Sequence, residues 1–179
     1  YTPDVVEYAL KSGFGLINDI TGASDEAIIE LAVRYEVKLC IMHMQGSPQT
    51  MQKNPEYDDV MAEVSDFFAE RISKCESLGL GRENIILDVG IGFGKTLEHN
   101  LTLIKNMEHF KVFGCELLVG ASRKSMIDKI IPCGDDERLA GCDRQCLQIE
   151  LESGPTALLA PHCKPPAHQF YQTQADGQP

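Results

Sequence analysis

Short apolar runs alternate along the chain with segments whose apolar residues recur at helical spacing. We predict buried strands over residues 14–20, 37–42, 85–87 and 117–119. Helices are expected from Thr2–Pro3 to Gly13, after a Ser24 cap, over 58–78 and 99–107, and after Ser122. Near-continuous apolar strands that alternate with helices are typical of a parallel sheet with helices outside it. The pattern therefore predicts an α/β fold.

Polar side chains gather where the predicted strands end. They are Asn18 and Asp19, His43, Asp88, and Ser122 to Lys124. In a βα barrel the carboxyl ends of the strands form the active-site face. An open doubly wound sheet gathers such residues at its switch point. The order of elements fits both architectures, and both place these side chains along one edge.

Composition narrows the range of partners. The chain has 179 residues, 43% of them hydrophobic, which suits one domain with a substantial core. A formal net charge of -11 argues against nucleic acid or an anionic membrane as the main partner. No apolar stretch approaches the roughly 18 residues of a membrane span. The first residue, Tyr1, stands directly before a helix signal, which suggests a segment of a longer protein.

The seven cysteines predict reduced thiols and no metal site. Cys40, Cys75 and Cys115 lie in apolar patterns and are expected to be small buried hydrophobes. The other four lack the CxxC spacing of a zinc site. From residue 155 onward the chain is rich in Pro and Gln, with no periodicity beyond residues 157–159. We therefore expect a domain over 1–154 and an irregular, disordered tail over 155–179.

The glycine-rich stretch LDVGIGFGKT, residues 87–96, ends like a nucleotide-binding P-loop. The P-loop pattern is G-x-x-x-x-G-K-[ST], and its first glycine would have to stand at Val89. Val89 is β-branched and poorly suited to the backbone conformation that this glycine adopts. Gly90 would make the loop one residue too short. The stretch is therefore not expected to bind a nucleotide, and its glycines need another explanation.

The polar groups at the strand ends suit a flat heterocycle with an amide edge. The Asp88 carboxylate and the Asn18 side chain can pair with amino and ring N–H groups, while Lys124 donates to a ring carbonyl or nitrogen. Phe93 can cover an aromatic substrate. Simpler roles stay open for some of them. Asn18 can cap a turn, Lys124 can belong to an exposed helix start, and the residues around His43 can be core packing.

Four motifs occur together in one order: LINDITG at 16–22, IMHMQGSPQTMQKNPEYDDV at 41–60, ILDVGIGFGKTLEHN at 86–100 and LLVGASRKSMI at 117–127. They resemble the dihydropteroate synthase family of pterin-binding enzymes, and the resemblance runs from residue 1 to about residue 141. It implies a (β/α)8 barrel and a transferase of folate biosynthesis. Such enzymes join a dihydropterin pyrophosphate to p-aminobenzoate, and in this family sulfonamides compete with p-aminobenzoate. The resemblance further implies a cytoplasmic location and a homodimeric parent.

The resemblance also implies roles for individual residues. Asp88 and Lys124 would be the catalytic residues, acting by charge stabilisation and hydrogen bonding at the pterin. The substrate-binding residues would be Asn18, Ile20, Met42, Asp88, Phe93, Gly120, Lys124 and Ser125, with Phe93 and Ser125 on the p-aminobenzoate side. Mg²⁺ would bind the pyrophosphate. No metal ligand is expected in this chain, because the family's loop Asn that reaches the metal has no counterpart in it.

The chain departs from the family at several points. Val89 replaces the usual proline, which should loosen the turn slightly. The family's first barrel strands have no counterpart, so we expect a partial barrel with little or no activity on its own. After Gly141 the composition shifts abruptly, and Ala160-Pro161-His162 stands where Arg-x-His belongs. A reading-frame error or a damaged gene beyond Gly141 is our hypothesis for that change.

Two other functions remain open. Pterin-binding methyltransferases that use methyltetrahydrofolate share the barrel and its Asp and Asn positions. A non-catalytic pterin-binding remnant would keep the pocket without turnover. The SRKS segment, residues 122–125, favours the synthase.

Overall fold

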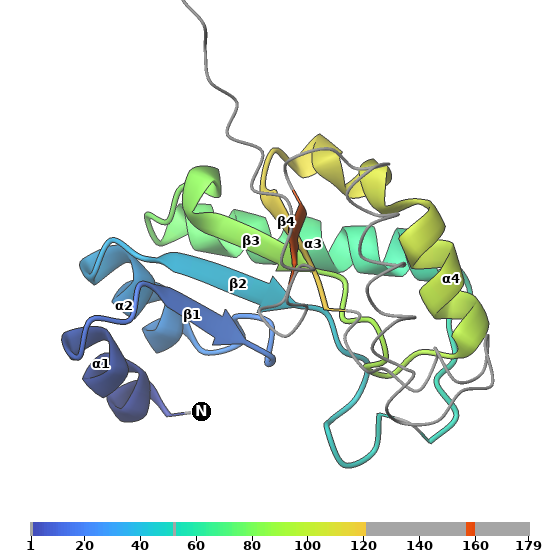
Figure 1. The fold of residues 1–179 in the computed structure, drawn as a ribbon, viewed down its shortest axis with the longest axis horizontal. Coiled ribbons are helices and arrows are strands. Elements are labelled where there is room, and N and C mark those ends of the chain that lie inside the picture. Colours follow the sequence, from blue (N-terminus) through green and yellow to red (C-terminus); the bar gives the residue numbers. More distant parts are fainter. Residues whose placement is uncertain (1, 52, 121–156, 160–179) are drawn as a thin grey trace, which may run out of the picture.

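A computed structural model describes residues 2–51, 53–120 and 157–159. They form a five-stranded parallel sheet in the order β1-β2-β3-β4-β5 (Figure 1). The strands are β1 (Leu16–Asp19), β2 (Lys38–Met42), β3 (Ile85–Asp88), β4 (Glu116–Val119) and β5 (Ala157–Leu159). Their spatial order repeats their order in the chain, whereas an open doubly wound sheet reverses its order at a switch point. The fold is therefore α/β and forms part of a (β/α)8 barrel.

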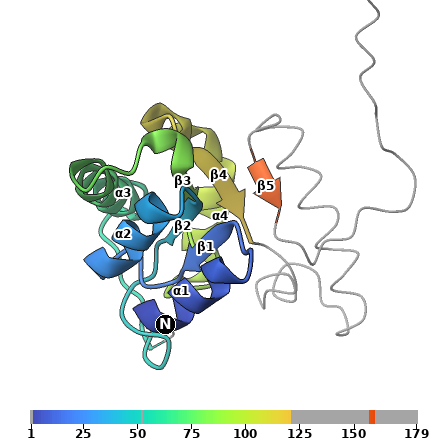
Figure 2. The same cartoon turned by 90° about the vertical axis from the view of Figure 1, so that its left-hand side faces the viewer.

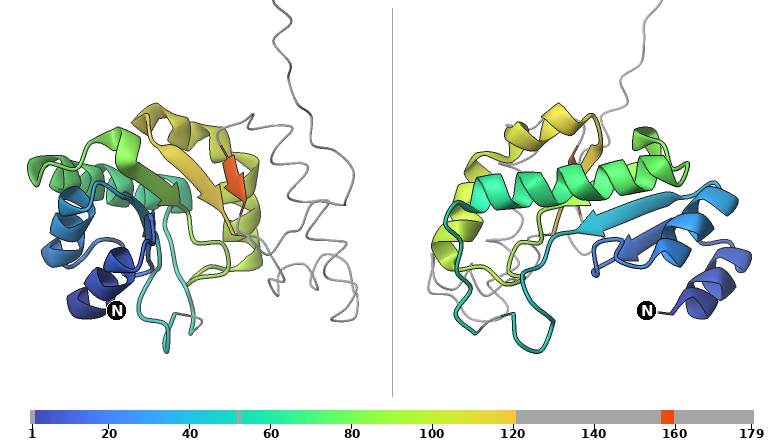
Figure 3. Two further views of the ribbon diagram at one scale, coloured as in Figure 1. Left: turned by 60° about the vertical axis from the view of Figure 1, so that its left-hand side comes forward. Right: turned by 180° about the vertical axis from the view of Figure 1, so that it is seen from behind.

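Helices cover one side of this sheet. They are α1 (Pro3–Lys11), α2 (Glu26–Arg34), α3 (Val60–Ser77) and α4 (Leu97–Lys105), with 3₁₀ turns η1 (Arg82–Asn84) and η2 (Met107–Phe113). Figure 2 shows the strands as an arc with α2 and α3 on its outer side. Seen from behind, α3 lies on the near side of the sheet, with β2 just below it in this view (Figure 3). This matches the predicted layering of parallel strands and outer helices.

The helix starts follow local hydrogen bonding. The predicted Ser24 cap is wrong: Asp25 is the N-cap of α2, and its side chain accepts from the Ala27 N–H at 3.0 Å. Ser24 instead donates its hydroxyl to Thr21. The helix expected over 99–107 begins earlier, at Leu97, because the Thr96 side chain accepts the His99 N–H and fixes the first turn. It ends at Lys105, before the separate turn η2.

Strand alternation divides the sheet residues between two faces. Ile17, Leu39, Ile41, Leu87 and Leu117 face the helices and share one apolar core with the inner residues of α2 and α3. The opposite face therefore carries the alternate positions, which are Asn18, Cys40, Met42, Ile86 and Asp88. The predicted site residues that lie on described strands, Asn18, Met42 and Asp88, thus all belong to the face turned away from the helices.

The segment after residue 120 is described only at β5, which pairs in parallel with β4. β5 coincides with the one apolar run noticed in the tail, so a short strand lies within the segment that we expected to be irregular. The proposed boundary at 154/155, Cys133, Cys142, Cys146 and Cys163, and the helix expected after Ser122 lie outside the described residues. In the part of the chain that the structure describes, no helix is long and apolar enough to cross a membrane.

Candidate active site

Asp88 is the last residue of β3 and is only 7% exposed. Its Oδ1 accepts the backbone N–H of Gly90 at 2.8 Å, which orients the carboxylate. Its Oδ2 lies toward the neighbouring strand end, 3.9 Å from where a Cβ of Gly120 would stand. A Cβ at position 120 would thus make an ordinary van der Waals contact with this oxygen. Asp88 therefore presents one oriented carboxylate oxygen toward the end of β4.

Met42 is the register partner of Asp88 and ends β2 beside it. Its side chain is buried, and its strand position places it on the same sheet face as Asp88. Asn18 pairs with Cys40, one layer below Met42 on that face, and is exposed. Ile20 follows β1 directly and is half-buried, as is Gly120 after β4. The structure thus brings Asn18, Met42 and Asp88 to one face at neighbouring strand ends.

Asp19, the neighbour of Asn18, has a structural role in the loop after β1. It is 2% exposed, and its carboxylate accepts from the N–H and hydroxyl of Thr21 and from the N–H of Ala23, all within 2.9 Å. These bonds shape the loop that leaves β1. Gly22 within it lies so close to Phe67 that a Cβ would stand 2.5 Å from the ring. Asp19 therefore builds the loop beside Asn18, and its oxygens point into that loop.

The glycines of the stretch after β3 are explained by contact with backbone. Gly90 and Gly94 both have positive φ, +67° and +63°. A Cβ on Gly90 would overlap the carbonyl oxygen of His43, and a Cβ on Gly94 would lie 2.7 Å from that of Gln45. The loop after β3 therefore lies directly on the loop after β2. The glycines allow this close approach. This is the explanation that they needed once a P-loop had been rejected.

Lys95, the lysine of the P-loop-like ending, points inward and is 4% exposed. Its Nζ lies 2.9 Å from Nδ1 of His43 and donates to the carbonyl oxygens of His43, Gly90 and Phe93 at 3.0–3.3 Å. An ammonium group can only donate, so His43 Nδ1 accepts and its ring proton is on Nε2. Burial, together with the Lys95 charge, lowers the pKa of His43 to about 3. His43 is therefore neutral near pH 7.

Two further side chains fix the same loop. Asn100 is 3% exposed, accepts the Gly92 N–H through Oδ1 at 2.8 Å and donates to the Thr96 carbonyl at 2.7 Å. The Tyr57 hydroxyl donates to the Gly94 carbonyl at 2.9 Å. The half-buried Phe93 sits between these attachments, and its N–H donates to the Gly90 carbonyl at 3.0 Å. Phe93 thus lies in a loop that is held by side-chain hydrogen bonds to the residues on either side of it, Gly92 and Gly94.

Sequence reasoning missed the roles of Lys95, Asn100 and Tyr57. Lys95 was considered only as part of a P-loop ending, and no local signal tells that its side chain turns inward. Asn100 carries a weak signal, since a polar residue four positions after a helix cap can bond back to that turn. Lys124 and Ser125 lie outside the described residues, so their predicted roles stay predictions.

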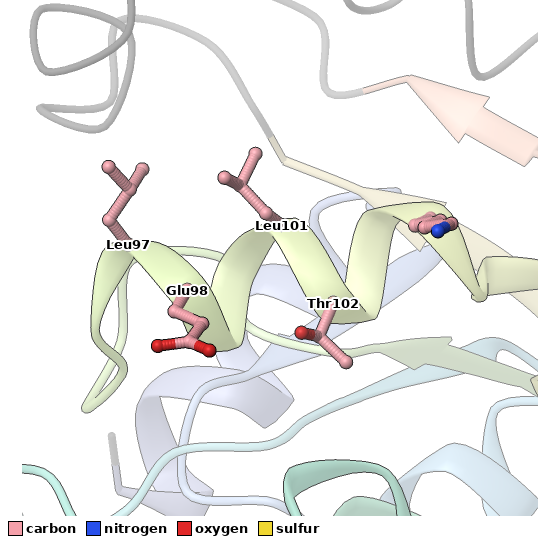
Figure 4. A pocket seen from close by; sticks show the side chains of 5 residues that line it. Leu97, Glu98, Leu101 and Thr102 are labelled. Atoms are coloured by element: carbon pink, nitrogen blue, oxygen red, sulfur yellow. The ribbon is translucent and has the colours of Figure 1, made fainter.

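A separate hollow lies along α4 and is lined by Leu97, Glu98, Leu101, Thr102 and Lys105. Figure 4 shows Leu97 and Leu101 pointing to one side of the helix and Glu98 and Thr102 to another. None of the predicted site residues lines it, so it is not part of the candidate site. Among the described residues, no group of three His, Cys, Asp or Glu side chains could hold a metal ion.

An oriented carboxylate at the carboxyl ends of parallel barrel strands, with an aromatic residue on an adjacent loop, lies where enzymes of the barrel class carry their active sites. The family described as pterin binding enzyme matches residues 1–152. The chain belongs to this pterin-binding enzyme family.

The relatives that the chain resembles are dihydropteroate synthases. It is 46% identical over 139 residues to the enzyme of Escherichia coli K12, a match that spans 78% of this chain and 49% of the relative. It is 42% identical over 137 residues to that of Haemophilus influenzae, covering 76% of this chain and 50% of the relative. The chain therefore spans about half the length of these relatives.

Solved structures give the same likeness. Dihydropteroate synthase from Stenotrophomonas maltophilia superposes with a TM-score of 0.83 at 36% identity, covering 91% of this chain and 62% of that one. The Thermus thermophilus enzyme in complex with 4-aminobenzoate gives 0.81 at 37% identity, covering 88% and 61%. The Yersinia pestis enzyme with a sulfonamide drug gives 0.81 at 34% identity, covering 88% and 57%. These values support the partial barrel.

Proposed function

We propose that the chain is the pterin-binding part of a dihydropteroate synthase. The whole protein would condense 6-hydroxymethyl-7,8-dihydropterin pyrophosphate with p-aminobenzoate to give 7,8-dihydropteroate and pyrophosphate. The observation that carries the proposal is Asp88: a buried carboxylate at a barrel strand end, oriented by Gly90 and facing Gly120. It lies in the segment that matches the synthases at 46% identity.

In this proposal Asp88 and Asn18 bind the polar edge of the pterin. The carboxylate oxygens accept from the pterin's amino and ring N–H groups, the pairing that a carboxylate can offer to such an edge. Met42 packs against the ring, while Ile20 and Gly120 line the pocket. Lys124 donates to the pterin. Phe93 and Ser125 lie toward p-aminobenzoate, the side on which sulfonamides would compete.

The reaction we propose breaks the bond between the pterin methylene carbon and the pyrophosphate oxygen, and the electron pair leaves with pyrophosphate. The cation that remains is stabilised by resonance with the pterin ring. The amine nitrogen of p-aminobenzoate then forms a bond to the methylene carbon and releases one proton. The protein contributes positioning and charge stabilisation, to which Asp88 and Lys124 add most.

Mg²⁺ on the pyrophosphate belongs to the proposal only through the family resemblance. The described residues contain no metal-binding cluster, so they offer no ligand set for it and no step is assigned to it. We further propose that the whole protein is a cytoplasmic homodimer whose partners are these two small molecules, with no role in nucleic-acid or membrane binding. The 179-residue chain alone should have little or no synthase activity.

Ligand binding by the purified chain tests the site. Calorimetric titration with dihydropterin pyrophosphate should show binding by the wild type and at least tenfold weaker binding by Asp88→Asn. Asp66→Asn, which makes the same change at an exposed position of α3, should bind like the wild type. Absence of binding by the wild type, or equal binding by both variants, would overturn the assignment of the pterin site.

Turnover by a chimera tests the reaction. The 139 residues that match the Escherichia coli synthase would replace the corresponding segment of that enzyme, which restores the remainder of the barrel. The chimera should form dihydropteroate from the two substrates, and its Asp88→Asn variant should not. Methyl transfer from methyltetrahydrofolate in place of this product would favour the methyltransferase alternative. Pterin binding without any product would favour a non-catalytic remnant.

A further inference from the structure

Lys95 lies at the junction of the two loops that carry the candidate site. One loop follows β2 at Met42, and the other follows β3 at Asp88. Lys95 belongs to the second loop, and its Nζ reaches Nδ1 and the carbonyl oxygen of His43 in the first. The same Nζ also holds the carbonyl oxygens of Gly90 and Phe93 in its own loop. One cation thus gathers acceptors from both loops.

These contacts lead directly to the residues proposed to bind the two substrates. Gly90, held by Lys95 through its carbonyl, donates its N–H to Asp88 Oδ1 at 2.8 Å. His43 donates its N–H to the Asp88 carbonyl at 2.8 Å, next to Met42. Phe93 is held through its own carbonyl at 3.0 Å. Lys95 therefore contacts Phe93 directly and reaches Asp88 through Gly90, so it is connected to the residues proposed for p-aminobenzoate and for the pterin.

The burial of Lys95 excludes a direct role for its ammonium in binding pyrophosphate. The residue is 4% exposed, and its Nζ already lies within 3.3 Å of four protein acceptors. An ammonium group has three donors, and moving it would remove the Lys95 hydrogen bonds from three carbonyl groups and from His43 Nδ1. The energetically favoured position of Nζ is the one between the loops.

We propose that Lys95 is a positioning residue that sets Asp88 and Phe93, and with them the two substrates, at a fixed separation. The inference rests on the proposed function, because it assigns the pterin to Asp88 and p-aminobenzoate to Phe93. Without Lys95, Asp88 and Phe93 can leave the geometry that binds each ligand, so each ligand binds more weakly, and two reactants held loosely react more slowly than two held in the correct geometry. Lys95 does not touch either substrate.

The experiment compares the wild-type chain with Lys95→Met, Lys95→Arg and Lys105→Met. Lys105→Met is the matched control, since it removes the same charge from an exposed position of α4. Amide hydrogen exchange should become at least tenfold faster over residues 90–95 in Lys95→Met and stay unchanged in α2 and α3. Titration with dihydropterin pyrophosphate and with p-aminobenzoate should show at least tenfold weaker binding of each ligand.

Two signals separate positioning from a general loss of stability. The ¹⁵N resonance of His43 Nδ1 should shift in Lys95→Met, because its donor is gone, and not in Lys105→Met. Lys95→Arg keeps a cation with N–H donors and should recover part of the binding that Lys95→Met loses. Unchanged loop exchange together with ligand affinities within twofold of the wild type would overturn the inference, as would equal losses in Lys95→Met and Lys105→Met.

Failure of the proposed function gives a different result. In that case the wild-type chain binds neither ligand, while the exchange rates and the His43 resonance still report on the loops. Faster amide exchange confined to residues 90–95 in Lys95→Met would then support the role of Lys95 in holding the two loops together. A change spread evenly over α2, α3 and the loop would contradict it.

Discussion

The backbone of Gly90 lies so close to the carbonyl oxygen of His43 that a Cβ on Gly90 would overlap it. This contact joins the loop after β3 to the end of β2, 47 positions earlier in the chain. It exists only because Gly90 has no side chain and adopts a φ of +67°. The candidate site therefore depends on a glycine that binds nothing itself.

Gly90→Ala should destabilise the chain by about 3 kcal/mol, since left-handed backbone costs about 1–2 kcal/mol without glycine and the overlap adds about 1–3 kcal/mol. Gly114→Ala is the matched control, because Gly114 has a φ of +69° but no atom within 4 Å of its Cβ position. Gly114→Ala should lose only the cost of the left-handed backbone conformation, about 1 kcal/mol. Urea unfolding of both variants measures the difference, and equal losses would contradict the contact.

The two buried carboxylates at strand ends should respond differently to the same substitution. In Asp88→Asn the amide oxygen can still accept the Gly90 N–H, so we expect a smaller loss of unfolding free energy than in Asp19→Asn. Both carboxylate oxygens of Asp19 accept hydrogen bonds. In Asp19→Asn the side-chain NH₂ replaces one of these oxygens and must face an N–H or hydroxyl donor. We expect a loss of about 1–3 kcal/mol. Chemical denaturation of the pair checks this, and the reverse order would refute it.

Asn100→Ala should destabilise the loop after β3, because it removes the side-chain acceptor of the Gly92 N–H and one of the two Asn100 donors to the Thr96 carbonyl. Loss of a buried hydrogen-bond partner costs about 1–3 kcal/mol, so a loss of about 2 kcal/mol is expected. Asn106→Ala removes a similar bond, from Asn106 to the Thr102 carbonyl, at an exposed position. It should cost less than about 1 kcal/mol. Thermal unfolding of both variants would show whether burial makes this difference.

The strands could be predicted from sequence because each is a local property. Residues 85–88 form an apolar run closed by an acid, and β3 occupies that run. Parallel pairing then brings Met42 and Asp88 together without further information. The predicted substrate residues Asn18, Met42 and Asp88 could be placed on one face for the same reason.

The contacts between loops could not be predicted in this way. Lys95 and His43 stand 52 positions apart, and nothing near either residue specifies their contact. Asp19 and Asp88 both end apolar strands, yet one turns into its loop and the other toward Gly120. Local pattern gives the same expectation for both. Only the packing of the loops on one another decides where each carboxylate points.

The buried cysteines should resist alkylation in the folded chain. Cys40, Cys75 and Cys115 are buried as the sequence predicted, and burial raises the pKa of each thiol, to about 11 for Cys75 and Cys115. The thiolate is the reactive form, so iodoacetamide at pH 8 should leave all three unmodified until urea unfolds the chain. Mass spectrometry of peptides provides the measurement. Rapid native labelling of any of the three would contradict the packing.

His43 should make stability depend on pH. Its folded pKa, about 3, lies below the ordinary value of 6.5, so the unfolded chain binds a proton that the folded chain excludes. The stabilisation is complete above pH 6.5 and is lost as pH falls toward 3, with a limiting slope of about 1.4 kcal/mol per pH unit. Urea unfolding between pH 7 and 4 should show this slope, and His43→Gln should remove that share of it. His109→Gln, an exposed histidine change, is the control, and an identical pH dependence in both variants would show that His43 does not supply the slope.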